Sequence, residues 1–152
     1  MEGLQAKLDE WYTADPNRQK TFDQTIKGQL PGVSLRKLDW TVTNYSKRHT
    51  VTYPHPETKE PYPLYLDYKD TLRTFHKPLF DPFRRKAKSG KDDKAATICQ
   101  KNFMKWAIKN GLIEYVRNNG QAIEQDMMSF KKRKLANAAA EDPDQETGKS
   151  PE

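Results

Sequence analysis

The chain has 152 residues, a length that fits one folded domain able to bury a core without disulfides or metal. Its 27 lysines and arginines exceed its 21 aspartates and glutamates, so the formal net charge is +6, and only 34% of its residues are hydrophobic. No stretch approaches the roughly 18 consecutive apolar residues of a membrane span, and the single cysteine excludes an intrachain disulfide or a cysteine-built zinc site.

Three helices are predicted before residue 50. Apolar residues at helical spacing cover residues 2–14. A second helix is expected to follow Asp15 as its cap, with an apolar stripe that ends at Leu30. Ser34 is expected to cap a third stripe over residues 35–45, although the β-branched and aromatic residues in this stretch also fit a strand.

The middle of the chain is richer in β-forming side chains. Residues 50–53 and 62–68 carry them, and prolines and a charged stretch separate the two, which predicts a β-hairpin with a long loop. The prolines confine the flanks to sheet edges, since proline cannot donate to a ladder of hydrogen bonds. Asp70 is then expected to cap a short helix that packs Leu72 and Phe75 onto the core.

The C-terminal half is predicted to be helical between two irregular segments. Residues 84–94 are expected to form a basic loop, and the apolar spacing after it predicts a helix to about Asn110 with a glycine break at Gly111. A last helix is expected over residues 121–135, and no apolar periodicity remains from Ala138 onward. Its inward-facing residues are expected to be Ile123, Met127, Met128 and Phe130.

The predicted fold is a mainly helical α+β single domain over residues 1–137 with one β-hairpin, followed by a disordered acidic tail over residues 138–152. The last twelve residues hold five acids against one base, so residues 1–140 carry a net charge of +10. Such an excess favours a phosphate-bearing or acidic partner.

Basic side chains from distant parts of the chain are expected to form one surface that follows a phosphate backbone. They come from the ends of the third helix, the basic loop, one face of the helix after it and the end of the last helix. The predicted nucleic-acid contacts are Arg36, Lys37, Lys47, Arg48, Arg84, Arg85, Lys86, Lys88, Lys91, Lys94, Lys101, Lys105, Lys109, Lys131, Lys132 and Arg133. If about six phosphates are neutralised, the logarithm of affinity should fall with the logarithm of salt concentration at a slope near −5.

The sequence predicts no enzyme, no cofactor and no bound metal, because no catalytic constellation stands out. One alternative is a magnesium-dependent nuclease, in which Asp67 and Lys69 would follow an apolar strand and Asp39 would supply a second carboxylate. The same acidic–any–basic triplet occurs at residues 57–59, so the pattern has little specificity in a chain that is 32% charged.

Three stretches carry a resemblance to a known group of proteins. KLDWTVTNYSK (37–47), YKDTLRTFHKPLFDPFRR (68–85) and ATICQKNFMKWAIKNGLIEYVRNNGQAIEQDM (96–127) resemble a small uncharacterised protein shared among large nucleocytoplasmic DNA viruses, of the iridovirus, marseillevirus and mimivirus kind. The resemblance spans roughly residues 35–128. It implies a virion or virus-factory protein associated with the genome, located in the virion, the host cytoplasm or the nucleus.

The resulting functional expectation is a virion-associated protein that binds double-stranded DNA without sequence preference and does not enter membranes. A homodimer is expected if exposed aromatic side chains such as Trp11, Trp40 and Tyr62 are buried between subunits. A third alternative to DNA binding and nuclease activity is an interaction module whose basic face binds other virion proteins or acidic host proteins.

Overall fold

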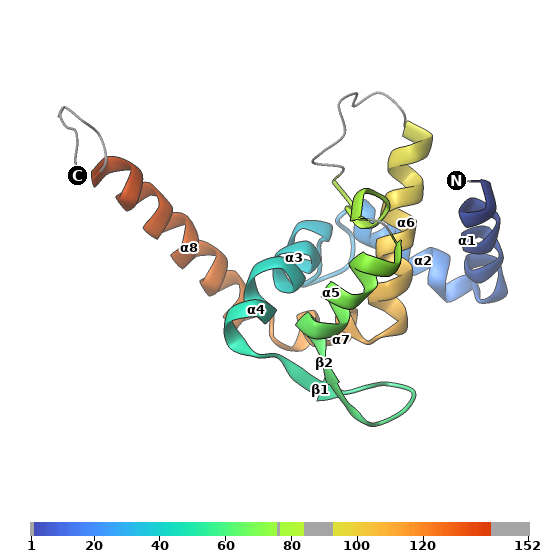
Figure 1. Ribbon diagram of the computed structural model, residues 1–152, viewed down its shortest axis with the longest axis horizontal. Helices are drawn as coiled ribbons and strands as arrows, with labels where there is room; N and C mark the ends of the chain where they lie inside the picture. The colour runs from blue at the N-terminus through green and yellow to red at the C-terminus, as the bar shows by residue number, and fades with distance from the viewer. Residues whose placement is uncertain (1, 76, 84–92, 141–152) are drawn as a thin grey trace. The chain divides into compact units, whose positions relative to one another are not determined.

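The computed structural model describes residues 2–75, 77–83 and 93–140 (Figure 1). The chain divides after Gly120 into two units, and this boundary falls inside the single domain that the sequence predicts. The first unit holds the hairpin, the core and the described helices before Gly120, and the described part of the second unit is one helix. The predicted fold class is confirmed, because the described chain is mainly helical with one two-stranded antiparallel hairpin.

The two N-terminal helices begin where the sequence predicts. Helix α1 spans Glu2–Ala14 and helix α2 spans Pro16–Ile26. The Asp15 side chain accepts a hydrogen bond from the backbone N–H of Asn17 at 3.0 Å, and Pro16 occupies the first helical position, where its missing N–H costs nothing. The predicted continuation of α2 to Leu30 is wrong, because the helix ends at Ile26 and Gly28 then takes a left-handed conformation with a φ of 69°.

The third predicted helix also forms, so the strand alternative for this stretch is wrong. Helix α3 spans Leu35–Trp40, continues as the π-helical turn η1 over Thr41–Tyr45 and ends as α4 over Ser46–His49. The Ser34 hydroxyl accepts from the backbone N–H of Lys37 at 3.1 Å and caps α3 as expected. The Thr41 hydroxyl donates to the backbone carbonyl of Lys37 at 2.7 Å, so a side chain occupies this acceptor as the helix widens into η1.

The hairpin is shorter than predicted. Strand β1 spans Thr52–Pro54 and pairs with β2 over Pro61–Pro63, with Tyr53 opposite Tyr62. The predicted strand over residues 62–68 is therefore wrong beyond Pro63.

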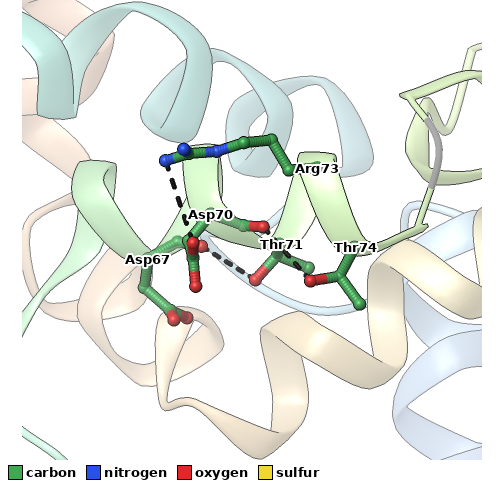
Figure 2. A network of polar contacts seen from close by, with 5 residues as sticks. All are labelled: Asp67, Asp70, Thr71, Arg73 and Thr74. Atoms are coloured by element: carbon green, nitrogen blue, oxygen red, sulfur yellow. Dashed lines mark hydrogen bonds and ion pairs between the residues drawn. The ribbon is translucent and has the colours of Figure 1, made fainter.

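Helix α5 replaces the rest of that strand and spans Leu64–Phe75. Leu64 and Tyr68, four residues apart, are both buried, which is the spacing of one helical face. Asp70 lies inside α5 rather than capping a new helix, so that prediction is also wrong. Figure 2 shows the polar side of this helix, where the hydroxyls of Thr71 and Thr74 donate to the carbonyls one turn earlier, at 2.8 and 3.4 Å.

The hairpin is attached to the end of helix α6, which spans Asp93–Lys109. The Tyr53 hydroxyl donates to the backbone carbonyl of Asn110 at 2.8 Å, and His55 Nε2 lies 2.9 Å from Asn110 Oδ1. Because His55 Nδ1 accepts from the backbone N–H of Glu57 at 3.0 Å, the proton of the neutral ring lies on Nε2. Asn110 therefore forms hydrogen bonds with both β1 and the loop that follows it.

The core of the first unit is built from aromatic rings around α6. Phe80, at the end of the 3₁₀ turn η2 over Lys77–Phe80, lies 5.7 Å from Phe103 and 5.6 Å from Trp106 between ring centroids. Tyr68 of α5 lies 5.8 Å from Trp106. These edge-to-face and tilted contacts add to the burial of large apolar areas. Helix α6 starts at Asp93, so the prediction of a loop is wrong for residues 93 and 94, which are helical.

The C-terminal helices follow the glycine break that the sequence predicts. Gly111 has a φ of 78°, and α7 then spans Leu112–Asn118. Helix α8 spans Gly120–Ala140, so the prediction of disorder from Ala138 onward is wrong for its first three residues, and residues 141–152 lie outside the described chain. Ile123 is buried as expected, but Met128 is 60% exposed and Phe130 is 36% exposed, so their predicted inward orientation is wrong. Over the residues that the structure describes, none of the helices has the length and apolar character needed to cross a bilayer.

Candidate nucleic-acid interface

Helix α6 carries three of the predicted contacts on one face. Lys101, Lys105 and Lys109 recur every four residues, so they lie above one another along the helix. Helices α1 and α2 both pack against α6 (Figure 1), so this face adjoins the N-terminal segment. The lysines are therefore part of a surface built from three helices.

Lys101 lies against aromatic side chains of both N-terminal helices. Its Nζ is 5.5 Å from the ring centroid of Tyr12 and 5.8 Å from that of Phe22. The Tyr12 hydroxyl donates to the backbone carbonyl of Lys101 at 2.9 Å, which joins α1 to α6 at this residue. A cation over an aromatic ring is attracted by the negative face of the ring.

Trp11 holds two further cations. The guanidinium carbon of Arg18 lies 4.1 Å from the indole centroid, and Arg18 also donates to the backbone carbonyl of Trp11 at 2.8 Å. Lys105 Nζ lies 5.8 Å from the same indole, and the ring itself packs edge-on against Tyr12 at 4.9 Å. The aromatic rings thus hold Arg18, Lys101 and Lys105 close to one another.

The electrostatics of this surface are positive. Burial is the main cause that lowers the pKa of Lys105, and the positive charges of Lys109, Lys7 and Arg18 lower it further. Within the described part of the chain, Arg18, Lys101 and Lys105 form no ion pair with a carboxylate. We call this set of cations and rings the basic–aromatic face. Its members are Lys7, Arg18, Lys101, Lys105 and Lys109 with Trp11, Tyr12 and Phe22.

Sequence reasoning missed Lys7 and Arg18. Residues 1–33 hold five acids and four bases, so this segment shows no excess of positive charge by composition. The available signal was the placement of Lys7 and Trp11 four residues apart, one helical turn, in a stripe next to the buried Leu8 and Tyr12.

Four other predicted contacts lie on α3 and α4, and one of them is buried. Arg36 on α3 and Lys47 and Arg48 on α4 are exposed. Lys37 is buried, 8% exposed, and its Nζ donates to the backbone carbonyl of Gly32 at 3.2 Å, so we remove it from the phosphate-contacting set. Tyr62 is buried as well, which removes it from the aromatics expected between subunits.

The remaining predicted contacts lie in three places. Lys94 lies in the first turn of α6. On the second unit, the contacts on the exposed part of α8 are Lys131, Lys132 and Arg133. The contacts outside the described residues are Arg84, Arg85, Lys86, Lys88 and Lys91.

The carboxylate proposed for a magnesium site has a different environment from the one expected. Asp67 lies on α5 rather than after a strand, and its Oδ2 accepts from the Tyr62 hydroxyl and from Trp106 Nε1, the latter at 3.1 Å. Asp39 is buried on α3, whereas Lys69 is exposed on α5. Among the residues that the structure describes, no group of three or more histidine, cysteine, aspartate or glutamate side chains is arranged to hold a metal ion.

Comparison with known proteins places the chain among viral sequences. The model of a family described as "Family of unknown function (DUF7197)" matches residues 4–150. Over 139 residues the chain is 33% identical to "Uncharacterized protein L507" of Acanthamoeba polyphaga mimivirus, and the alignment covers 84% of this chain and 53% of that protein. The chain thus spans about half the length of this relative. No solved structure matches. The expected resemblance to a mimivirus-type protein is confirmed. The family match covers residues 4–150 and so extends beyond the expected range of 35–128 at both ends.

Proposed function

This chain belongs to the DUF7197 family, and we propose that it binds double-stranded DNA without sequence preference as a genome-associated protein of a large DNA virus. The observation that carries the proposal is the basic–aromatic face, where cations from α2 and α6 gather on aromatic rings of α1 and α2. Cations held close together repel one another, and a negatively charged partner such as a phosphate backbone lowers that repulsion.

The geometry favours contacts with phosphates over contacts with bases. Arg18 lies over the Trp11 ring, so that face of the indole is not open for base stacking. Lys101, Lys105 and Lys109 are spaced by one helical turn each, about 6 Å along the axis, which lets successive lysines reach different phosphates. Phosphate contacts fix the position of a duplex and carry no direct sequence information.

A salt titration with paired variants tests this proposal. Anisotropy of a labelled random-sequence duplex is measured across salt concentrations for the wild type, for Lys105→Gln with Lys109→Gln, and for the control Lys59→Gln with Lys69→Gln. Both variants lose two lysine charges, but Lys59 and Lys69 are exposed residues outside the basic–aromatic face. The first variant should bind more weakly and show a salt slope that is shallower by about 1.8, the loss of two phosphate contacts. The control should bind as the wild type does.

Two outcomes favour the alternatives. Absence of duplex binding even at about 50 mM salt, where phosphate contacts are strong, excludes DNA binding and favours an interaction module for acidic proteins. Magnesium-dependent cleavage of the duplex, lost in Asp67→Ala while that variant stays folded, favours the nuclease. Equal weakening by both lysine pairs refutes the placement of the contact on α6.

A further inference from the structure

The second half of helix α8 carries an unusual distribution of charge. From Met127 to Ala140 it holds four consecutive bases and no acid, a net charge of +4. Every residue from 131 to 138 is exposed, so this stretch shows no covered side among the described residues. A surface helix of a globular protein normally buries one apolar stripe. This segment has none, so a partner that binds it meets a helix that is polar around most of its circumference.

The four bases point in different directions. Successive residues of an α-helix are about 100° apart, so the side chains of Lys131, Lys132, Arg133 and Lys134 are spread over roughly 300° around the axis. A flat surface or a single phosphate strand meets one side of such a helix and leaves the other cations in solvent. A partner with negative charge on both sides of the helix meets most of them.

The major groove of B-form DNA has this arrangement. It is about 12 Å wide, it admits a helix about 10–12 Å across, and phosphates line both of its edges. We propose that the segment 127–140 of α8 enters the major groove of duplex DNA, an inference that rests on the proposed DNA binding and adds a second contact. The cations then reach phosphates on both walls of the groove.

The residues after the basic run suit a helix lying deep in the groove. Ala136 and Ala138 have short side chains that allow close approach, and Leu135, which is 62% exposed, gains apolar contact with thymine methyl groups. Asn137, the one amide side chain among residues 131–138, lies about 200° around the axis from Leu135 and faces away from the bases when Leu135 faces them. The Leu135 contact adds little sequence preference to binding that is mostly electrostatic.

DNA binding should also stabilise this part of the helix. Lys131 and Lys134 are three residues apart, where like charges repel across the helix surface. A helix without tertiary packing is only marginally stable in water. Neutralising the four cations with phosphates removes that repulsion, so the helical signal in circular dichroism should increase when duplex DNA is added.

The test compares two duplexes of one sequence with the full-length protein. One is unmodified DNA, and the other carries glucosylated hydroxymethyl groups on its cytosines, which fill the major groove and leave the phosphates in place. We expect the wild type to bind the modified duplex at least about ten times more weakly, since the groove is where the helix lies. Equal affinity for the two duplexes overturns the inference and leaves the proposed phosphate binding intact.

Variants separate the two contacts. Replacing Lys131, Lys132, Arg133 and Lys134 together by glutamine keeps good helix formers and should abolish the difference between the duplexes. Lys105→Gln with Lys109→Gln should weaken binding to both duplexes and preserve the difference. If the quadruple variant still discriminates between the duplexes as the wild type does, α8 is not the element in the groove. If no variant or wild-type protein binds either duplex, the proposed function fails and this inference with it.

Discussion

The carboxylate of Asp67 accepts hydrogen bonds from Tyr62 of the hairpin and from Trp106 of α6. Both donors belong to buried side chains, and each would lose its partner if the carboxylate were removed. Asp67 thereby connects β2, α5 and α6. A carboxylate oxygen can bind either a metal ion or a hydrogen-bond donor. In this structure Asp67 Oδ2 binds two neutral donors, the Tyr62 hydroxyl and Trp106 Nε1.

We therefore expect Asp67→Ala to lower the free energy of unfolding by about 2–4 kcal/mol, because it leaves two buried donors without an acceptor. Urea unfolding followed by circular dichroism measures this. Asp70→Ala is the matched control, because Asp70 lies one turn later with an exposed carboxylate whose Arg73 partner is 3.8 Å away (Figure 2). An exposed pair of this kind contributes about 0–1 kcal/mol. Equal stability of the two variants would contradict the connecting role of Asp67.

At the scale of elements, α5 shows why a short apolar run is ambiguous. LYLDY alternates apolar and polar residues as a strand does, and the prolines before it fit the edge of a sheet. The same residues place Leu64 and Tyr68 on one helical face, and both are buried in the first unit. Helix formation gives the core Leu64 and Tyr68 from successive turns and leaves Leu66 exposed, whereas a strand would place Leu66 on the same face as both.

The junction between α6 and α7 depends on the absence of a side chain at Gly111. This residue has a φ of 78°, and a Cβ placed on it would lie 2.9 Å from Cδ of Pro56 in the hairpin loop. The junction and the loop are thus packed against each other at a glycine, close to the hydrogen bonds that Asn110 makes with Tyr53 and His55.

Gly111→Ala should therefore destabilise the protein more than Gly28→Ala does. Gly28 has a similar φ of 69°, but a Cβ there meets open space, so its substitution costs only the left-handed conformation, about 1–2 kcal/mol. At Gly111 the contact with Pro56 adds about 1–3 kcal/mol. Thermal or urea unfolding of the two variants gives the difference directly. If both variants lose the same stability, the hairpin loop does not pack on this junction.

For the molecule as a whole, the buried tyrosines Tyr12 and Tyr62 and the half-buried Tyr53 and Tyr115 make stability depend on alkaline pH. Burial raises the pKa of Tyr12, Tyr53 and Tyr62 above the ordinary value of 10.0, and burial together with the neighbouring Tyr45 raises that of Tyr115 to about 12. The folded state therefore holds these phenols neutral at pH values where the unfolded chain ionises them.

The contribution of these tyrosines to the free energy of unfolding should be constant below about pH 9. It should fall as the pH rises through 10 and beyond, because the phenols of the unfolded state release their protons first. The lowered pKa of Lys105 makes the free energy of unfolding rise with pH below its ordinary pKa of 10.5. This is the effect of one lysine, and the four tyrosines act in the opposite direction. Urea unfolding at a series of alkaline pH values measures the slope. Tyr12→Phe should make the fall shallower, and a stability that stays level up to about pH 11 would contradict the burial of these phenols.

Local sequence patterns specify α1, the starts of α2 and α3, the break at Gly111 and the helical character of α6. These depend on hydrogen bonds and caps formed between residues a few positions apart, as at Asp15 and Ser34, so the information lies within each segment. The resemblance to a viral protein also came from the sequence alone and is confirmed.

Contacts between residues far apart in the chain depend on how the helices pack together. Tyr12 meets Lys101 across 89 positions of the chain and Asp67 meets Trp106 across 39, and no local pattern encodes either contact. The packing of α1 and α2 on α6 brought Lys7 and Arg18 to the lysines of that helix, whereas composition showed the N-terminal segment as balanced in charge. Burial of apolar faces is non-directional, so periodicity shows that a helix has a face to cover, whereas the assembled core determines which segment covers it.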